Sequence, residues 1–251
     1  MRNYYPDGLY VWDTWYQEDG EDTHVFYLQI RRPGSKYSEE YEGTIGHAVS
    51  RDLLNWKELP TALYKGEAGS YDDGPLFTGC TVKHDGKWYL YYSSNHRVND
   101  RTLSGMCVAI STDGVNWERH PDNPVITPDP EWYYHKDSNP PSHYYHCYPD
   151  VDCRDLAIVK DPDGDGWLGY VVVRLKDGNM NETCCMALVE SDDLIHWEMK
   201  EPCCAPNRFI CFEVPEVFEL DGKWYMLALT GDGYGQRRRW TDPFIVHGTV
   251  V

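Results

Sequence analysis

Residues 50–56 read Ser50-Arg51-Asp52-Leu53-Leu54-Asn55-Trp56, and their pattern, S-x-D-[LG]-x-[NH]-W, returns at residues 111–117 and 191–197. Hydrophobic residues stand just before each copy, as expected where a strand leads into a polar turn. Three copies at well-separated places in the chain indicate an internal structural repeat. The repeat therefore decides how the rest of the sequence is interpreted.

An aromatic segment that opens on a short polar turn precedes each copy. Asp85-Gly86 before residues 87–92 shows this most clearly, and related segments lie at 21–28, 163–170 and 221–227. Asp-Gly pairs favour two-residue hairpins because both positions adopt positive φ. The sequence thus predicts a four-stranded antiparallel module, with third strands such as 106–110 and 186–189 and a Trp-bearing outer strand. In the fourth unit, residues 240–244 are the candidate closing piece.

Modules of this kind start near residues 10, 75, 153 and 213. Such a sheet cannot bury both faces alone, and radial packing of copies gives a β-propeller. We expect an all-β fold, a five-bladed β-propeller, in a single domain over residues 1–251. Four blades are recognisable. The fifth is either missing or built from sequence without the pattern, and we expect the chain to be incomplete at its C-terminal end.

The amino-acid composition limits which classes of binding partner we expect. The net charge of −18 argues against nucleic acid, because phosphate binding needs clustered Lys and Arg. Tyr (20) and Trp (10) favour strands and supply flat surfaces on which sugar rings stack. No stretch approaches the apolar length of a membrane span, and no signal peptide is recognisable. Nine cysteines, an odd number, fit reduced thiols in a cytoplasm, with secretion after removal of a leader as the alternative.

Residues 121–152 form an unusually long connection in the second unit, rich in Pro, Tyr, His and Asp. Long loops in compact domains are often functional. Its aromatic residues are candidates for outer sugar subsites, with ordinary loop packing as an equal alternative. These residues are Trp132, Tyr133, Tyr134, Tyr144 and Tyr145.

Three acids, Asp13, Asp155 and Glu213, stand where the first strand of a predicted blade begins. First strands line the channel of a propeller, so we expect these carboxyl groups to converge near its axis. Close carboxylates repel one another, which separates their pKa values. Glycoside hydrolysis needs that division between a proton donor and an anionic nucleophile or base. Phe212 and Val214 give Glu213 the apolar setting that suits the proton donor.

Two residues close to these acids, Glu216 and Arg154, allow more than one interpretation of the site. Glu216 competes with Glu213 as proton donor, but residues three apart in an extended strand point to opposite faces, which favours Glu213. Arg154 is a candidate to hold an anionic partner or a sugar hydroxyl, or simply to form an ion pair. No metal or cofactor is expected, since the loop that begins at Asp161 resembles a calcium loop but has Val172 where its last ligand would stand.

Four stretches carry a family resemblance. Residues 213–218, E-V-P-E-V-F, resemble an E-C-P-D-[LF]-F motif, and 154–156, R-D-L, an R-D-P motif; residues 50–63 and Phe77-Thr78-Gly79-Cys80 match S-x-D-L-x-x-W-x-x-x-P-x-A-L and F-S-G-S. Together they resemble glycoside hydrolase family 32, the β-fructofuranosidases, within the five-bladed propeller glycosidases that include family 43. The family's W-M-N-D-P-N-G motif is replaced by Val11-Trp12-Asp13-Thr14-Trp15, which precedes Phe26-Tyr27 by about the family's interval.

The resemblance implies a retaining hydrolase of terminal β-fructofuranosyl or similar furanosyl linkages. Asp13 would be the nucleophile, Glu213 the general acid/base and Asp155 the transition-state stabiliser. The carbohydrate substrate would contact further residues of these motifs. They are Arg154, Trp12, Phe77, Thr78 and Trp15.

Two other functions stay open. One is an inverting arabinofuranosidase or xylosidase of the family 43 kind, with Asp13 as base. The other is a non-catalytic carbohydrate-binding propeller, left inactive by the altered first motif and a missing blade. A homo-oligomer, or a partner chain that supplies the missing blade, is the macromolecular partner we consider.

Overall fold

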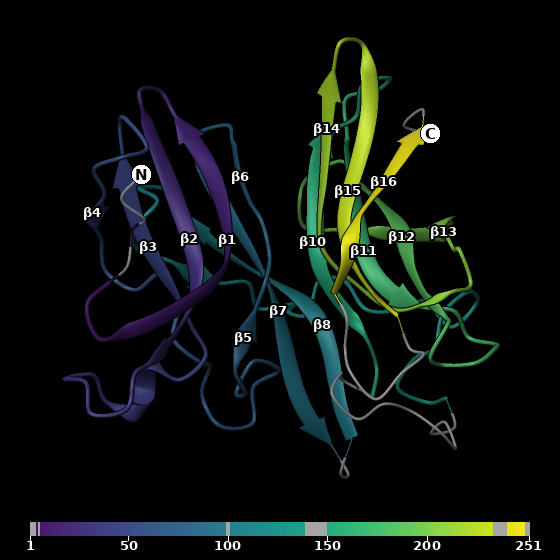
Figure 1. Ribbon diagram of the computed structural model, residues 1–251, viewed down its shortest axis with the longest axis horizontal. Helices are drawn as coiled ribbons and strands as arrows, with labels where there is room; N and C mark the ends of the chain where they lie inside the picture. Colours follow the sequence, from purple (N-terminus) through teal and green to yellow (C-terminus); the bar gives the residue numbers. More distant parts are fainter. Residues whose placement is uncertain (1–3, 5, 99–100, 139–149, 233–239, 249–251) are drawn as a thin grey trace.

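The computed structural model describes residues 4, 6–98, 101–138, 150–232 and 240–248, with side chains up to residue 231. These residues form four antiparallel sheets and one short 3-10 helix, Glu39–Tyr41 (Figure 1). The strands of each sheet are consecutive in the chain, so each sheet is one blade. The predicted all-β propeller fold is confirmed.

Blades 1 and 3 have the four strands that the repeat predicts, whereas blade 2 has five and blade 4 has three among the described residues. Blade 1 comprises β1 (Leu9–Asp19), β2 (Asp22–Arg31), β3 (Thr44–Ser50) and β4 (Lys57–Glu58). Blade 2 comprises β5 (Leu76–Phe77), β6 (Thr81–His84), β7 (Lys87–Val98), β8 (Arg101–Ser111) and β9 (Glu118–Arg119). Blade 3 comprises β10 (Cys153–Lys160), β11 (Trp167–Arg174), β12 (Cys184–Ser191) and β13 (Glu198–Cys204). Blade 4 comprises β14 (Phe209–Leu220), β15 (Lys223–Asp232) and β16 (Trp240–Gly248).

Local turn chemistry explains the hairpins. At Asp85-Gly86 and Asp221-Gly222 both residues have positive φ, as the expected two-residue turn requires. The S-x-D turn is equally regular. Ser50 Oγ accepts the amide of Leu53, and Asp52 Oδ1 accepts the amides of Leu54 and Asn55. The same hydrogen bonds recur in the copies at 111–117 and 191–197.

The tryptophans that end the second and third S-x-D motifs join neighbouring blades. Trp117 of blade 2 meets the ring of Phe26 in blade 1 edge-on at 5.7 Å. Trp197 of blade 3 meets Tyr91 in blade 2 at 5.9 Å, also edge-on. Blades 2 and 3 thus pack their motifs against a middle strand of the preceding blade. The fourth unit departs from expectation, because residues 240–244 lie in β16, its third strand, instead of a closing outer strand.

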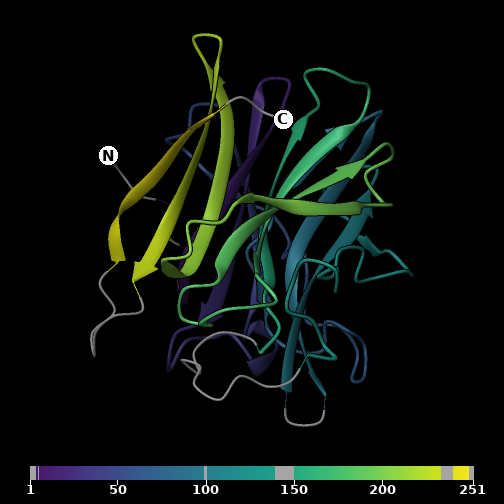
Figure 2. The same ribbon diagram turned by 90° about the vertical axis from the view of Figure 1, so that its right-hand side faces the viewer.

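Inner strands meet where the blades come together. β10 lies against β14 and β7, and β6 lies against β1. The long strands of successive sheets run roughly alongside one another, while β1 and β14 stand apart (Figures 1 and 2). The described residues contain four blades, and the fifth blade that we predict is not among them.

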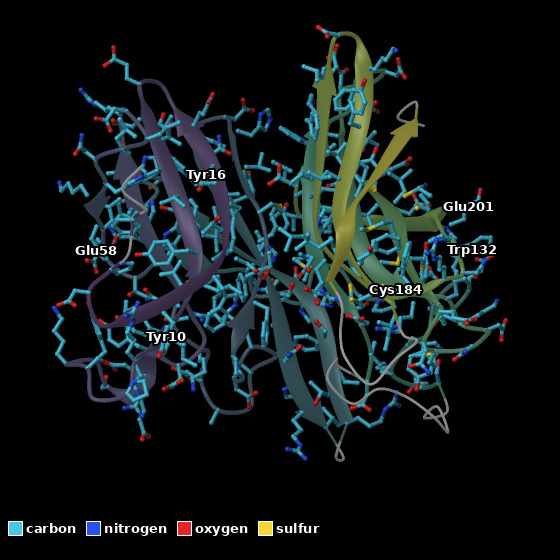
Figure 3. The ribbon with its side chains drawn as sticks, viewed as in Figure 1. Tyr10, Tyr16, Glu58, Trp132, Cys184 and Glu201 are labelled. Atoms are coloured by element: carbon cyan, nitrogen blue, oxygen red, sulfur yellow. The ribbon has the colours of Figure 1, made fainter. Side chains whose placement is uncertain are left out.

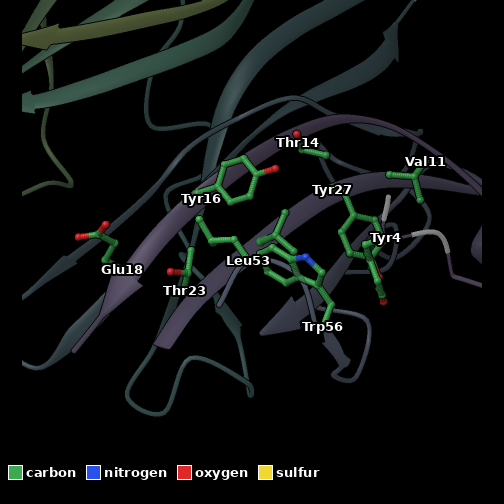
Figure 4. Close-up of a pocket in the computed structure, with 10 residues that line it drawn as sticks. Tyr4, Val11, Thr14, Tyr16, Glu18, Thr23, Tyr27, Leu53 and Trp56 are labelled. Atoms are coloured by element: carbon green, nitrogen blue, oxygen red, sulfur yellow. The ribbon is translucent and has the colours of Figure 1, made fainter. Parts of the chain in front are cut away.

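The outer face of blade 1 has no neighbouring sheet among the described residues. There a hollow of about 670 Å³ is lined by aromatic and polar side chains that include Tyr4, Tyr16, Trp56 and Leu53 (Figure 4). Leu53 is 59% exposed, whereas its counterpart in blade 3, Leu194, is fully buried against blade 2. This face therefore repeats the positions that pack against the preceding blade elsewhere. None of the three candidate acids lines it.

Two further observations concern the whole chain. Among the described residues, no helix is long and apolar enough to cross a membrane. Cys107, Cys153, Cys184 and Cys185 are buried thiols that form no disulfide. Burial raises the pKa of each thiol, Cys107 and Cys184 to about 12, so these side chains act as small apolar groups in the core.

Candidate active site

Each inner strand carries at least one residue more than its partner. In blade 1, Val11 pairs with Gln29 and Thr14 with Tyr27, so three steps along β1 match two along β2. Blade 3 shifts in the same way between Arg154 and Ala157, blade 4 between Glu213 and Glu216, and blade 2 between Phe77 and Thr81. Such β-bulges bend a strand and redirect its side chains. Each of the three candidate acids lies at one of these bulges.

Residues at the bulges adopt conformations that side chains rarely favour. Asp155 has φ of 54° and Val214 has φ of 49°, in the left-handed region. For a β-branched residue such as Val214 this is a true outlier, and strain of this kind is found mostly at functional sites. In blade 2 the bulge contains Gly79, where a Cβ would lie 1.9 Å from the carbonyl oxygen of Tyr91. Only glycine lets the inner strand approach β7 so closely.

The bulge of blade 4 corrects one prediction. Glu213 pairs with Leu229 and Glu216 with Leu227, two positions of β15 that share a face. The two glutamates therefore do not point to opposite faces, because the extra residue between them resets the alternation. Their surroundings differ instead. Glu213 is 22% exposed and lies 3.9 Å from Arg154 Nη2, while Glu216 is exposed nearer the hairpin end of β14.

Arg154 is the centre of the site. Its guanidinium is buried, and Nη1 donates to Asp155 Oδ2 at 2.8 Å. Nη2 donates to the carbonyl of Phe212 at 2.8 Å, and the amide of Val214 donates to the same Asp155 oxygen at 3.0 Å. These contacts fasten β14 to β10 on both sides of Glu213. The ion pair considered from sequence is present, and Arg154 also holds the backbone that carries the second acid.

Asp13 is linked to Asp155 through blade 2. Thr78 Oγ1 donates to Asp13 Oδ2 at 2.5 Å, and the Thr78 carbonyl accepts the hydroxyl of Ser93 at 2.6 Å. The backbone amide of Asp155 donates to that same Ser93 hydroxyl at 3.0 Å. A continuous set of hydrogen bonds thus runs from blade 1 to blade 3.

Electrostatics couples Asp155 to each of the other two acids. Burial raises the pKa of Asp155 to about 6, and repulsion from Glu213 and Asp13 adds to the rise. Arg154 and the amide of Val214 oppose it by stabilising the carboxylate. The sequence prediction that acids from blades 1, 3 and 4 come together is therefore supported by their mutual repulsion.

The aromatic residues predicted to contact substrate lie in different settings. Trp12, in the bulge beside Asp13, is 43% exposed and offers a surface on which a sugar ring can stack. Trp15 is buried, stacks on Phe26 and donates its indole N–H to Thr81 Oγ1 at 3.0 Å. Trp15 therefore joins blades 1 and 2, since its face is covered by protein. Phe77 is half-buried and packs on the same core.

The long connection in blade 2 is described over residues 121–138 and 150–152. Tyr133 and Tyr134 are buried, and the Tyr133 hydroxyl donates to the carbonyl of Lys200 at 2.6 Å. Packing is thus the role of these two, the alternative considered from sequence. Trp132 is 36% exposed and lies at the outer side of blade 3 (Figure 3). Tyr144 and Tyr145 lie outside the described residues.

Sequence reasoning missed three residues of the site. Ser93 joins the acids of blades 1 and 3, and its only signal was a polar pair, Ser93-Ser94, at the end of an aromatic strand. Asp152 and Arg174 are fully buried behind Arg154. Asp152 precedes the strand and offered no pattern. In the part of the chain that is described, no group of three or more His, Cys, Asp or Glu could hold a metal ion.

A propeller whose inner strands bring two carboxylates to one buried arginine, with a third acid that repels one of them, has the arrangement expected of a propeller glycosidase. The chain belongs to glycosyl hydrolase family 32: residues 6–242 match the family model described as Glycosyl hydrolases family 32 N-terminal domain. Sequence relatives include sucrose-6-phosphate hydrolase of Zymomonas mobilis, 25% identical over 216 residues. That match covers 80% of this chain and 38% of the relative, so the chain spans about two-fifths of its length.

Solved structures agree on the fold. Bombyx mori GH32 beta-fructofuranosidase BmSUC1 superposes with a TM-score of 0.68 at 22% identity, over 94% of this chain and 46% of the other. A thermostable family-43 glycoside hydrolase superposes with a TM-score of 0.58 at 16% identity, over 88% of this chain and 64% of the other. At these identities the similarity concerns the fold. The relation to both families that the sequence suggested is confirmed at that level.

Proposed function

We propose that the protein is a glycoside hydrolase that releases terminal β-fructofuranosyl, or similar furanosyl, units from oligo- or polysaccharides with retention. The observation that carries the proposal is that Asp155 and Glu213 share the buried Arg154, while Asp13 of blade 1 lies close enough to Asp155 to raise its pKa. Membership of family 32 supports the choice of a fructoside. Exposed Trp12 beside Asp13 suits a neutral sugar ring.

Each acid has a distinct role in the proposed reaction. A carboxylate oxygen of Asp13 attacks the anomeric carbon while Glu213 gives its proton to the leaving oxygen, so the glycosidic bond breaks as an ester bond forms. Water then attacks the anomeric carbon, returns a proton to Glu213 and frees Asp13. Asp155 accepts hydrogen bonds from sugar hydroxyls in its ionised form. Thr78 holds Asp13 in position through the 2.5 Å hydrogen bond.

Product stereochemistry tests both substrate and mechanism. The purified protein is given a fructan and an arabinoxylan oligosaccharide side by side, and the first-formed anomer is followed by NMR. We expect fructose released first as the β-furanose. Arabinose or xylose released with inversion would instead establish the family 43 mode, in which a carboxylate spacing of roughly 6.5 to 9.5 Å leaves room for water. The family-43 structural neighbour makes this the second candidate.

Substitution of Glu213 separates catalysis from binding alone. Glu213→Gln keeps the shape of the side chain but cannot donate a proton, so we expect kcat to fall about 10²- to 10⁴-fold. The loss should be smaller for substrates with an activated leaving group, which need no protonation. Glu216→Gln is the matched control and should retain activity, since Glu216 is exposed whereas Glu213 is partly buried beside Arg154. Sugar binding with background hydrolysis in wild type and both variants would identify a carbohydrate-binding module.

A further inference from the structure

Asp152 is a fully buried acid that immediately precedes β10. Its Oδ1 accepts a hydrogen bond from Arg154 Nε at 2.8 Å. Its Oδ2 lies 3.0 Å from Nη2 of Arg174, a second arginine with no exposed surface. Buried charges are retained only where they are paired, so one carboxylate here serves two buried cations.

The geometry of Arg154 shows what this pairing does. Asp152 takes the Nε side of the guanidinium, which directs Nη1 to Asp155 and Nη2 to the Phe212 carbonyl. The guanidinium is rigid and planar, so fixing one edge fixes the other. The Phe212 peptide is held a second time, because its amide donates to Cys184 Sγ at 3.1 Å. Cys184 lies between blades 3 and 4 (Figure 3).

We propose that Asp152 and Arg174 are positioning residues for the reaction, forming a buried charge pair that orients Arg154 and sets the field it exerts on Asp155 and Glu213. The proposal rests on the proposed function. Signs alternate along the series Arg174, Asp152, Arg154 and Asp155, so loss of any one inner charge changes the field at the next. Arg174 is itself anchored, since Nη1 donates to the Met180 carbonyl at 3.0 Å.

Few titratable or charged groups face Asp155 and Asp152. Asp155 faces Arg154 on its own strand, Glu213 of β14 and Asp13 of β1. Beyond the two arginines, Asp152 acts on the thiols of Cys153 and Cys184, which burial keeps neutral. Changing Asp152 or Arg174 replaces neither an acid of the reaction nor a residue that hydrogen-bonds to one. They are the clean positions for a test.

Removing the negative charge of Asp152 and removing the positive charge of Arg174 should shift the pKa of Asp155 in opposite directions. Asp152→Asn leaves more net positive charge beside Asp155 and should lower its pKa by about one unit, whereas Arg174→Met should raise it by a similar amount. The double variant Asp152→Asn with Arg174→Met removes both charges and should return it close to wild type. The pKa is read by carbon-13 NMR titration of labelled carboxyl groups in the intact chain, with Asp155→Asn assigning the signal. The acid limb of the kcat/KM profile should follow.

Asp72→Asn is the matched control. Asp72 is equally buried and accepts hydrogen bonds from Arg119 Nε at 2.6 Å and the Tyr92 hydroxyl at 2.8 Å, outside the site. Loss of the Asp72 charge should lower the stability of the fold without changing the pKa of Asp155. An Asp155 titration that is the same in wild type, Asp152→Asn and the double variant would overturn the proposal. If Asp152→Asn does not fold, the charge-balanced double variant and Arg174→Met still decide. Because the titration needs no turnover, wild type without hydrolysis would refute the proposed function and leave this test intact.

Discussion

Blade 2 differs from the other blades at one point of the inner strand. All four inner strands carry a one-residue bulge at nearly the same level. In blades 1, 3 and 4 an acid lies there, and in blade 2 the bulge holds Thr78 and Gly79. The bulge is therefore a property of the repeat, while the residue placed on it is a property of the site.

The acids do not occupy equivalent places in their bulges. Glu213 precedes the extra residue, whereas Asp155 and Asp13 lie within the shifted segment. Equivalent positions in neighbouring blades would present three like charges in the same orientation. Staggering lets each carboxylate find its own partner: Thr78 for Asp13, and Arg154 with the Val214 amide for Asp155. Blade 2 supplies the neutral donor that this arrangement needs.

The largest expected effect comes from removing the acid of blade 1. Asp13→Asn keeps the shape of the side chain but is a far weaker nucleophile, and we expect kcat/KM to fall about 10⁴-fold or more. Stability should be kept or slightly raised, because one of the charges that repel Asp155 is gone. Steady-state kinetics and thermal unfolding measure the two effects.

Asp19→Asn, at the end of the same strand, is the control. Asp19 pairs with Lys83 at the protein surface, so its substitution should leave kcat/KM within a factor of about two. Equal losses in both variants would mean that Asp13 acts through folding and has no direct part in the reaction.

Blade 2 can be tested through its neutral donor. Thr78→Val removes the hydroxyl that donates to Asp13, and a hydrogen bond to a charged group contributes on the order of 1.5 to 3 kcal/mol, so kcat/KM should fall about 10- to 100-fold. Thr81→Val on the same blade removes only the partner of the Trp15 indole. It should cost stability and spare kcat/KM. If Thr78→Val is as active as Thr81→Val, blade 2 has no share in the site.

The acid of blade 3 predicts a pH response in two opposite directions. With its pKa raised to about 6 by burial, Asp155 takes up a proton as the pH falls from 7 to 5, whereas in the unfolded chain it stays ionised down to about 4. Proton uptake by the native state means that this group stabilises the fold as the pH falls through that window. Activity should change in the opposite direction. We expect kcat/KM to fall about tenfold for each pH unit below 6, because the sugar hydroxyls donate hydrogen bonds to the ionised carboxylate.

Asp155→Asn checks the assignment of that response. The variant should be less active at pH 7 and should lose the limb near pH 6 from both the kcat/KM profile and the pH dependence of unfolding. A limb that persists unchanged would belong to another group.

Local patterns predicted the blades better than the contacts between them. Hairpins and S-x-D turns follow from neighbouring residues, and the meeting of Asp13, Asp155 and Glu213 follows from the repeat. Bulges break the period-two alternation on which side-chain direction depends, which is why the Glu213 and Glu216 prediction failed. For the same reason Trp12 and Trp15, grouped as sugar contacts from sequence, divide into an exposed and a buried ring.

The Asp152 and Arg174 pair was beyond sequence reasoning for a different reason. Its two residues are far apart in the chain and meet only because Cys153 pairs with Val173 across β10 and β11. A register of that kind depends on the exact number of residues in the hairpin and in the bulge. No residue pattern specifies it before the sheet is known.

The smallest expected effect concerns the bulge itself. Val214 pays for its position with φ of 49°, which costs an L-residue roughly 1 to 2 kcal/mol and a β-branched one at least as much. Val214→Asn should relieve part of that cost, because asparagine tolerates the left-handed region, and raise the free energy of unfolding by about 1 kcal/mol, read from chemical denaturation. Val217→Asn, on the same strand outside the bulge, should lower it instead, since asparagine disfavours ordinary strand positions. If both variants lose stability equally, the bulge of blade 4 is unstrained, and its equivalence with the glycine-bearing bulge of blade 2 is broken.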